Sequence, residues 1–64
     1  MCQATVYRNR NGDEEEILKE VISMERTEDG WIVKALLEEP RMVHGQIESI
    51  DFLKHTVTIS QEVL

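Results

Sequence analysis

Cys2 is the residue of this chain best suited to chemistry, because it is the only cysteine in 64 residues and directly follows Met1. The α-amine, a backbone amide and the thiol lie within one short segment, and neighbouring donors of this kind close five-membered chelate rings around a divalent ion. Thiolate combined with nitrogen suits nickel, copper or zinc, and four such donors in a plane suit nickel(II) or copper(II). The alternative is structural, because free cysteines are often small, buried hydrophobic residues. Residue type and position alone leave both interpretations open.

The two histidines are the other candidate metal ligands. His44 and His55 are 11 residues apart, which matches no zinc-ligand spacing, and no second cysteine completes a set. Asp51 is a candidate hydrogen-bond partner of His55 across a turn. For both histidines, a surface or hydrogen-bonded role is the alternative to metal binding.

The sequence contains no cluster typical of a catalytic site. The acidic run at residues 14–16 indicates a solvated face, since a hard-cation site needs oxygen ligands that converge from several elements. Gly12, Gly30 and Gly45 are isolated, so no phosphate-binding loop is present. We therefore do not expect an enzyme.

The length of the chain favours self-association. A domain of about 60 residues buries only about 60% of the surface that its unfolded chain exposes, and such domains often need disulfides, metals or oligomerisation. A single cysteine cannot form an intramolecular disulfide, although two chains could share a disulfide or a metal. We expect one domain over residues 1–64 that forms a homodimer.

The charge balance limits the partners. Thirteen acidic residues oppose seven lysines and arginines, which gives a net charge of −6 and disfavours contact with nucleic-acid phosphates. No apolar run approaches the roughly 20 residues of a membrane span, and the first residues lack a signal-peptide pattern. These features predict a soluble, cytoplasmic protein with no membrane partner, for which nucleic acid is a disfavoured partner.

Turn signals and alternation predict β-strands. Asn11-Gly12 and Asp29-Gly30 tolerate the positive φ that a two-residue type I′ hairpin turn requires, and Pro40 lacks the N–H group that a central strand needs. Between these breaks, apolar and polar residues alternate, which is typical of strands buried on one face. The alternating sets are Cys2, Ala4 and Val6; Trp31, Val33, Ala35 and Leu37; Val43, Gly45 and Ile47; and Val57 and Ile59.

Two segments depart from simple alternation. Ile50 and Phe52 change the parity of the third set, which predicts a β-bulge near Glu48 or Ser49. In residues 13–24, four apolar residues follow a helical spacing, while the hairpin signals on both sides favour a strand. They are Ile17, Leu18, Val21 and Ile22. We predict a strand for this segment, partly from the resemblance that follows.

Several segments, taken in order, resemble the CooT family of small nickel-binding proteins. They are Met1-Cys2-x-Ala4-x-Val6-Tyr7, Gly12-x-Glu14-Glu15, Leu18-x-Glu20-Val21 and Val43-x-Gly45-x-Ile47-x-x-Ile50-Asp51, followed by His55 and a short strand. The resemblance covers nearly the whole chain. It departs at Glu38, where members often carry glycine before the glutamate that follows the third strand. This departure concerns the local turn and not Cys2.

The resemblance implies an SH3- or Sm-like β-barrel of five to seven short antiparallel strands that forms a homodimer. It also implies one Ni(II) per dimer, bound through Cys2, in service of carbon monoxide dehydrogenase or a related nickel pathway. In a two-fold symmetric dimer, two Cys2 residues near the axis would supply two thiolates and two nitrogens. The nitrogen is the Cys2 amine if Met1 is removed; if Met1 remains, it is the Cys2 amide, with the Met1 amine also in reach.

Two classes of function follow from these observations. The first is a nickel carrier or metallochaperone without catalysis, whose partners are a nickel enzyme or its maturation factors. The second is a small β-barrel interaction module for RNA or protein, in which Cys2 has no metal role. The acidic balance counts against RNA.

Overall fold

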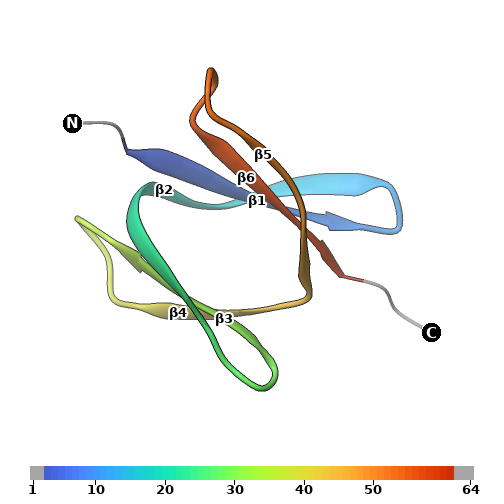
Figure 1. Ribbon diagram of the computed structural model, residues 1–64, viewed down its shortest axis with the longest axis horizontal. Helices are drawn as coiled ribbons and strands as arrows, with labels where there is room; N and C mark the ends of the chain where they lie inside the picture. The colour runs from blue at the N-terminus through green and yellow to red at the C-terminus, as the bar shows by residue number, and fades with distance from the viewer. Residues whose placement is uncertain (1–2, 62–64) are drawn as a thin grey trace.

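The computed structural model describes residues 3–61, which form a six-stranded mixed β-sheet (Figure 1). The strands are β1 (Ala4–Arg10), β2 (Asp13–Arg26), β3 (Gly30–Ala35), β4 (Arg41–His44), β5 (Gln46–Asp51) and β6 (Thr56–Gln61). Their order across the sheet is β4-β3-β2-β1-β6-β5. The predicted all-β fold and the predicted number of strands are confirmed. Within residues 3–61, no helix has the length and apolar character to cross a membrane.

The first hairpin turn forms as predicted, whereas the second is shifted by one residue. Asn11 and Gly12 have φ values of 52° and 90°, as a type I′ turn requires. In the second turn, the Thr27 amide donates to the Gly30 carbonyl at 2.8 Å. The central residues are therefore Glu28 and Asp29, and the Gly30 amide is held by the Thr27 hydroxyl at 3.1 Å.

β2 is a bent strand whose irregular register explains its helix-like pattern. Tyr7 pairs with Glu16 and Val6 with Leu18, which leaves Ile17 as an extra residue in the ladder. A second shift lies between Val6 and Ala4, where Glu20 adopts a φ of 56°. Such bulges let consecutive residues face the same side, and Ile17 and Leu18 are both buried. The strand prediction is therefore confirmed.

The link between β4 and β5 sets the direction of β6. A single residue, Gly45, separates these strands, so the chain bends there and does not reverse. A Cβ atom at Gly45 would collide with the Ser60 carbonyl oxygen, which explains why glycine occupies this position. Because β4 and β5 run in the same sense, β6 returns parallel to β1. The prediction of antiparallel strands is correct for the other four pairings within residues 3–61 and wrong for β1 and β6.

The sheet rolls over one core but does not close into the predicted barrel. In the part of the chain described, β4 and β5 form the two edges of the sheet. Because one residue joins them, they follow one another end to end and cannot pair along their lengths. The predicted bulge is present in β5, where Ile47 pairs with Ile59 and Ser49 with Thr58, leaving Glu48 as the extra residue.

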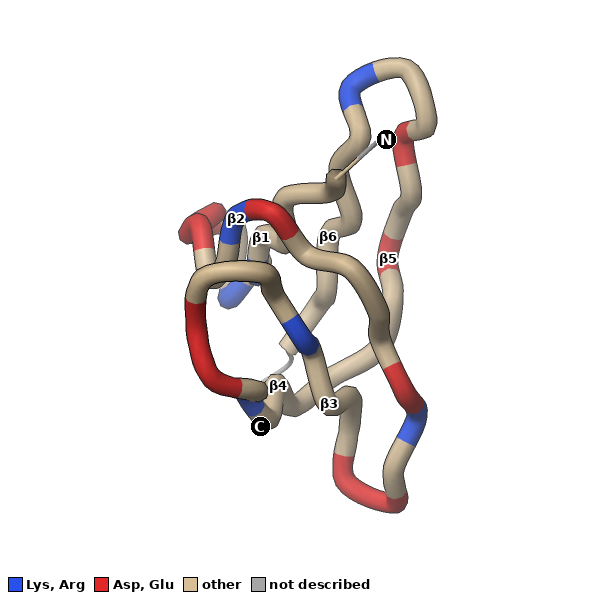
Figure 2. The backbone as a smooth tube through the Cα atoms, turned by 90° about the vertical axis from the view of Figure 1, so that its left-hand side faces the viewer, with Lys and Arg blue, Asp and Glu red and all other residues tan. Residues whose placement is uncertain are grey.

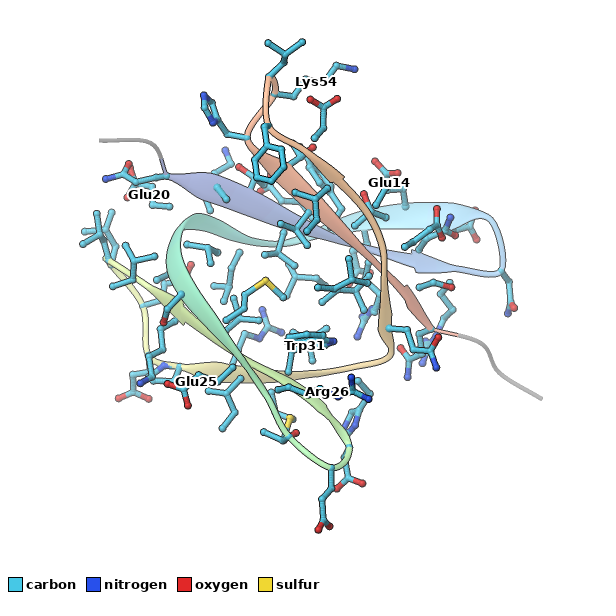
Figure 3. The ribbon with its side chains drawn as sticks, in the orientation of Figure 1. Glu14, Glu20, Glu25, Arg26, Trp31 and Lys54 are labelled. Carbon is cyan, nitrogen blue, oxygen red and sulfur yellow. The ribbon has the colours of Figure 1, made fainter. Side chains whose placement is uncertain are left out.

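The core lies inside the rolled sheet. Its buried members are Val6, Ile17, Leu18, Val21, Val33, Val43, Val57 and Ile59. Trp31 is partly buried and packs against them (Figure 3). Burying one such aliphatic side chain contributes roughly 1.5–3 kcal/mol. This shared core holds in place the strand ends that surround the start of β1.

Candidate metal centre at the chain start

Met1 and Cys2, the predicted metal ligands, lie outside the described residues, but the structure describes where the chain enters the sheet. Ala4 pairs with Val21, and Val21 pairs in turn with Ala35 at the end of β3. On the other side of β1, the Thr5 amide donates to the His55 carbonyl at 2.8 Å. β1 therefore begins between the β3–β4 connection and the β5–β6 turn (Figure 1).

We refer to this region as the chain-start end. It consists of the start of β1, the β3–β4 connection at residues 36–40 and the β5–β6 turn at residues 52–55. An open hollow lies within it beside Ala4. The residues that line the hollow are Ala4, Ile50, Asp51, Phe52, His55, Thr56 and Val57.

The β5–β6 turn is held by a carboxylate. Asp51 Oδ1 accepts hydrogen bonds from the amides of Leu53 at 2.9 Å and Lys54 at 3.0 Å. An aspartate that bonds the backbone two and three residues further on is a common way to fix a tight turn. The turn therefore projects Phe52 and Leu53 from an ordered backbone.

Large apolar side chains are unusually exposed at this end. Phe52 is 82% exposed, Leu53 is 94% exposed, and Leu37 in the β3–β4 connection is 81% exposed. Leu36 and Ile50 are also exposed. Single exposed apolar residues are ordinary, whereas a group of them on one side of a small domain marks a surface suited to burial.

The charges of the chain-start end are separated between its two loops. Lys54 follows Leu53 in the β5–β6 turn, whereas Glu38 and Glu39 follow Leu37 in the β3–β4 connection. Figure 2 shows the basic point of the turn and the acidic stretch of the connection well apart. The three ion pairs within residues 3–61 lie elsewhere. They join Arg8 to Glu15, Lys19 to Glu16 and Lys34 to Glu25.

Comparison with known families identifies the chain. The family model described as CO dehydrogenase accessory protein CooT matches residues 1–60. The chain belongs to the CooT family. The resemblance noted from the sequence is thereby confirmed, and the match begins at residue 1, so it includes Met1 and Cys2. No curated protein matches the sequence.

A solved structure shows the same CooT fold. The crystal structure described as that of CooT from Carboxydothermus hydrogenoformans matches with a TM-score of 0.85. The two sequences are 19% identical, and the match covers 97% of this chain and 100% of the other. At this identity the likeness concerns the fold alone.

The structure separates the two candidate histidines of this CooT protein. His44 Nδ1 lies 3.0 Å from the Asp29 carbonyl oxygen, beside the β2–β3 turn and away from the start of β1. His55 lies at the chain-start end, where its φ is 55° and its carbonyl accepts the Thr5 amide. In place of the expected bond to His55, the Asp51 carboxylate accepts hydrogen bonds from the Leu53 and Lys54 amides. The histidines therefore do not combine into one site.

Within residues 3–61, no three His, Cys, Asp or Glu side chains gather to hold a metal ion. The sequence reasoning did not identify the apolar loops beside the chain start. Two signals in the sequence point to them: the adjacent pairs Leu36-Leu37 and Phe52-Leu53 each break the alternation next to a turn.

Proposed function

We propose that this CooT protein is a nickel-binding accessory protein that carries Ni(II) through Cys2 and has no catalytic activity. The proposal includes Met1 as a second source of nitrogen and one ion per homodimer. The nickel is cargo, destined for carbon monoxide dehydrogenase or a related nickel enzyme or its maturation factors. We place the protein in a reducing cytoplasm, where the thiol stays free.

The observation that carries the proposal is the family match, which extends to the residue pair where the sole thiol lies. The family description names an accessory protein of CO dehydrogenase. A carrier must bind a metal and later release it, and a site at a chain end suits this task because no core packing has to change. Thiolate and nitrogen donors together match nickel(II).

The geometry at the start of β1 supports a site shared by two chains. Only Gln3 separates Cys2 from Ala4, so chain length alone keeps their Cα atoms within about 7 Å of each other. Ala4 itself lies amid exposed apolar side chains, which favours contact with a second surface. Two chains that meet there would bring two thiols within reach of one ion.

Nickel titration of the wild type and of Cys2→Ser tests the proposal. We expect a thiolate-to-nickel charge-transfer absorption that saturates at one ion per two chains and is absent from Cys2→Ser. Binding should weaken as the pH falls, because protons compete for the thiolate and the nitrogen donors. Native mass spectrometry gives the stoichiometry directly.

The matched controls are His44→Ala and His55→Ala, which should retain the absorption. Cys2→Ser should also keep the far-ultraviolet circular dichroism of the wild type, since the site lies at a chain end. If Cys2→Ser binds nickel as tightly as the wild type, or if one histidine variant alone loses the site, Cys2 is not the ligand.

A further inference from the structure

We propose that the outer face of the sheet over β1, the first half of β2, β5 and β6 is a docking surface for an extended, arginine-bearing segment of a partner protein. The guanidinium groups of that segment would lie against the Tyr7 ring and the carboxylates beside it. The inference goes beyond the proposed function, because it depends neither on nickel nor on a dimer.

The core determines which side chains face outward. Val6, Val57 and Ile59 are buried inside the rolled sheet, and successive residues of a strand point to opposite faces. Tyr7 and Asn9 therefore lie on the outer face, and the residues that pair with them across the neighbouring strands extend this face in two rows. The rows are Glu16, Tyr7, Thr58 and Ser49, and Glu14, Asn9, Ser60 and Gln46.

The two rows are polar throughout. They contain hydroxyl, amide and carboxylate groups and one aromatic ring, but no valine, isoleucine, leucine or methionine. The side chains of the two central strands, β1 and β6, are half-buried in these rows, whereas those of β2 and β5 are exposed. Such a face is solvated in the free protein. It therefore suits a partner that offers charge and hydrogen bonds.

Two carboxylates flank Asn9. Asn9 Nδ2 donates to Glu48 Oε1 at 3.5 Å on the β5 side, and Glu14 pairs opposite Asn9 on the β2 side. Figure 3 shows Glu14 projecting away from the interior of the rolled sheet. Asn9 Oδ1 also accepts the Gly12 amide at 3.0 Å, so both ends of the Asn9 amide group are held. This arrangement is in place before a partner arrives, which lowers the entropic cost of binding.

The carboxylates of Glu14 and Glu48 have no lysine or arginine partner within residues 3–61, where the three ion pairs involve other glutamates. A cation supplied by another protein can therefore meet them without first displacing an internal one. Charge complementarity of this kind fixes the register of an interface and speeds its formation.

The Tyr7 ring favours arginine over lysine. Tyr7 lies two residues before Asn9 on the same face, and Glu16 pairs opposite it. A guanidinium group can stack on an aromatic ring while it donates to a neighbouring carboxylate, whereas an ammonium group is a compact point charge. An arginine at this place would use the ring and the carboxylates together.

The strand pairing and the charge select the occupant. β1 is paired on both sides, with β2 and with β6, so the segment would bind through side chains and would not add a strand there. An extended segment presents every second side chain to one side, which suits a flat face. The acidic rows, in a chain of net charge −6, would repel nucleic-acid phosphates and the same face of a second copy.

An NMR titration of the metal-free protein with a synthetic peptide of alternating arginine and threonine tests the surface. At an ionic strength of about 0.15 M, we expect saturable shifts of amide signals in β1 and β6. A peptide of the same length with neutral citrulline in place of arginine should cause none. An arginine peptide that shifts no signal at millimolar concentration, or whose shifts lie mainly in β3 and β4, overturns the proposal.

Paired charge removals test the carboxylates. Glu14→Gln combined with Glu48→Gln should raise the peptide dissociation constant about tenfold, because two attractions are lost. Glu28→Gln combined with Glu38→Gln is the matched control, since both residues are exposed and the net charge changes equally. The control should stay within about twofold of the wild type. If both pairs weaken binding equally, net charge alone attracts the peptide and the surface is wrong.

The role of the ring is tested by the choice between two cations. The wild type should bind the arginine peptide about threefold more tightly than a peptide of alternating lysine and threonine. Tyr7→Leu should bind the two peptides equally, a change in preference that a merely structural role would not produce. A Tyr7→Leu protein that folds and keeps the preference for arginine rejects the stacking contact.

Two further outcomes are informative. Shifts of the same β1 and β6 signals that grow with protein concentration in the absence of peptide would assign this face to a second copy and overturn the proposal. Because the titration contains no metal and uses no Cys2 variant, its result is independent of whether Cys2→Ser binds nickel, so either proposal can fail alone.

Discussion

At the hairpin end of the molecule, where β1 turns into β2 and β2 into β3, the exposed side chains are mostly charged; at the chain-start end they are large and apolar. Arg8 and Glu15 form an ion pair of 2.9 Å near the first turn, and Glu28 and Asp29 form the second. Leu37, Phe52 and Leu53 lie at the chain-start end. Both ends are built from the same sheet and share one core.

This difference shows that the type of side chain exposed to solvent has a different cause at each end. The hairpin end is closed by backbone turns and interacts with water, so charged side chains suit it. The loops of the chain-start end are fixed by hydrogen bonds that backbone amides donate to the Asp51 carboxylate and the Glu20 carbonyl, yet they still expose leucine and phenylalanine. Exposed apolar side chains that gather in this way are typical of a surface that a partner covers.

The largest effect on stability is expected at Leu18. This residue lies at the bend of β2, is 1% exposed and belongs to the core that both ends share. Leu18→Ala should lower the free energy of unfolding by about 2–5 kcal/mol, since it removes buried methyl groups and leaves a cavity. Urea unfolding at a fixed protein concentration measures this loss, with nickel omitted.

Small domains of this kind have only about 3–5 kcal/mol of stability from the core, so much of the Leu18→Ala protein should be unfolded in buffer. Met42→Ala, at an exposed position, should change stability by about 0.5 kcal/mol or less. If Leu18→Ala unfolds at the urea concentration of the wild type, the two ends do not depend on a common core.

Much of the fold could be predicted because alternation and turn residues act locally. The type I′ turn at Asn11-Gly12, the bulge at Glu48 and the strand faces all follow from patterns within a few residues. The parallel pairing of β1 with β6 could not be predicted in this way. It depends on whether the chain bends or reverses at Gly45, and the alternation continues through that residue in either case.

The candidate site was predicted less completely than the fold. The sole thiol and the family resemblance point to Cys2, and the family is confirmed, while the metal stays a prediction. The two loops beside the chain start belong to different parts of the sequence. Ala4, Val21 and Ala35 align across the sheet only after the bend in β2 has formed, so the juxtaposition of the loops is a tertiary property.

A smaller effect is expected from Gly12→Ala at the hairpin end. The position has open space for a methyl group, but its φ is 90°, which L-residues disfavour. Stability should fall by about 1 kcal/mol, while the dimer dissociation constant and the nickel absorption should stay unchanged. Urea unfolding, sedimentation and a nickel titration together check this separation.

The control for this variant is Asn11→Gly, which keeps a pair suited to the type I′ turn and should stay near the wild type. A Gly12→Ala protein that loses nickel binding while it remains folded would show that the two ends are coupled, contrary to the comparison drawn above.

The smallest signal is expected in an RNA-binding experiment, because we predict no measurable binding of RNA at an ionic strength of about 0.15 M. Counterion release drives most binding to phosphate backbones and needs several clustered lysines or arginines. Here the hairpin end is acidic, and Lys54 is the single basic residue of the two chain-start loops. Fluorescence anisotropy with labelled mixed oligonucleotides measures the affinity.

Base stacking on aromatic side chains should also add little to the affinity for RNA. Single-stranded RNA is held by bases stacked on exposed aromatic rings. Trp31 is partly buried against the core, which leaves Phe52 as the strongly exposed ring among the Phe, Tyr and Trp of the described residues. A complex of micromolar affinity that weakens with salt and is lost in both Phe52→Ala and Lys54→Glu would assign the chain-start end to nucleic acid.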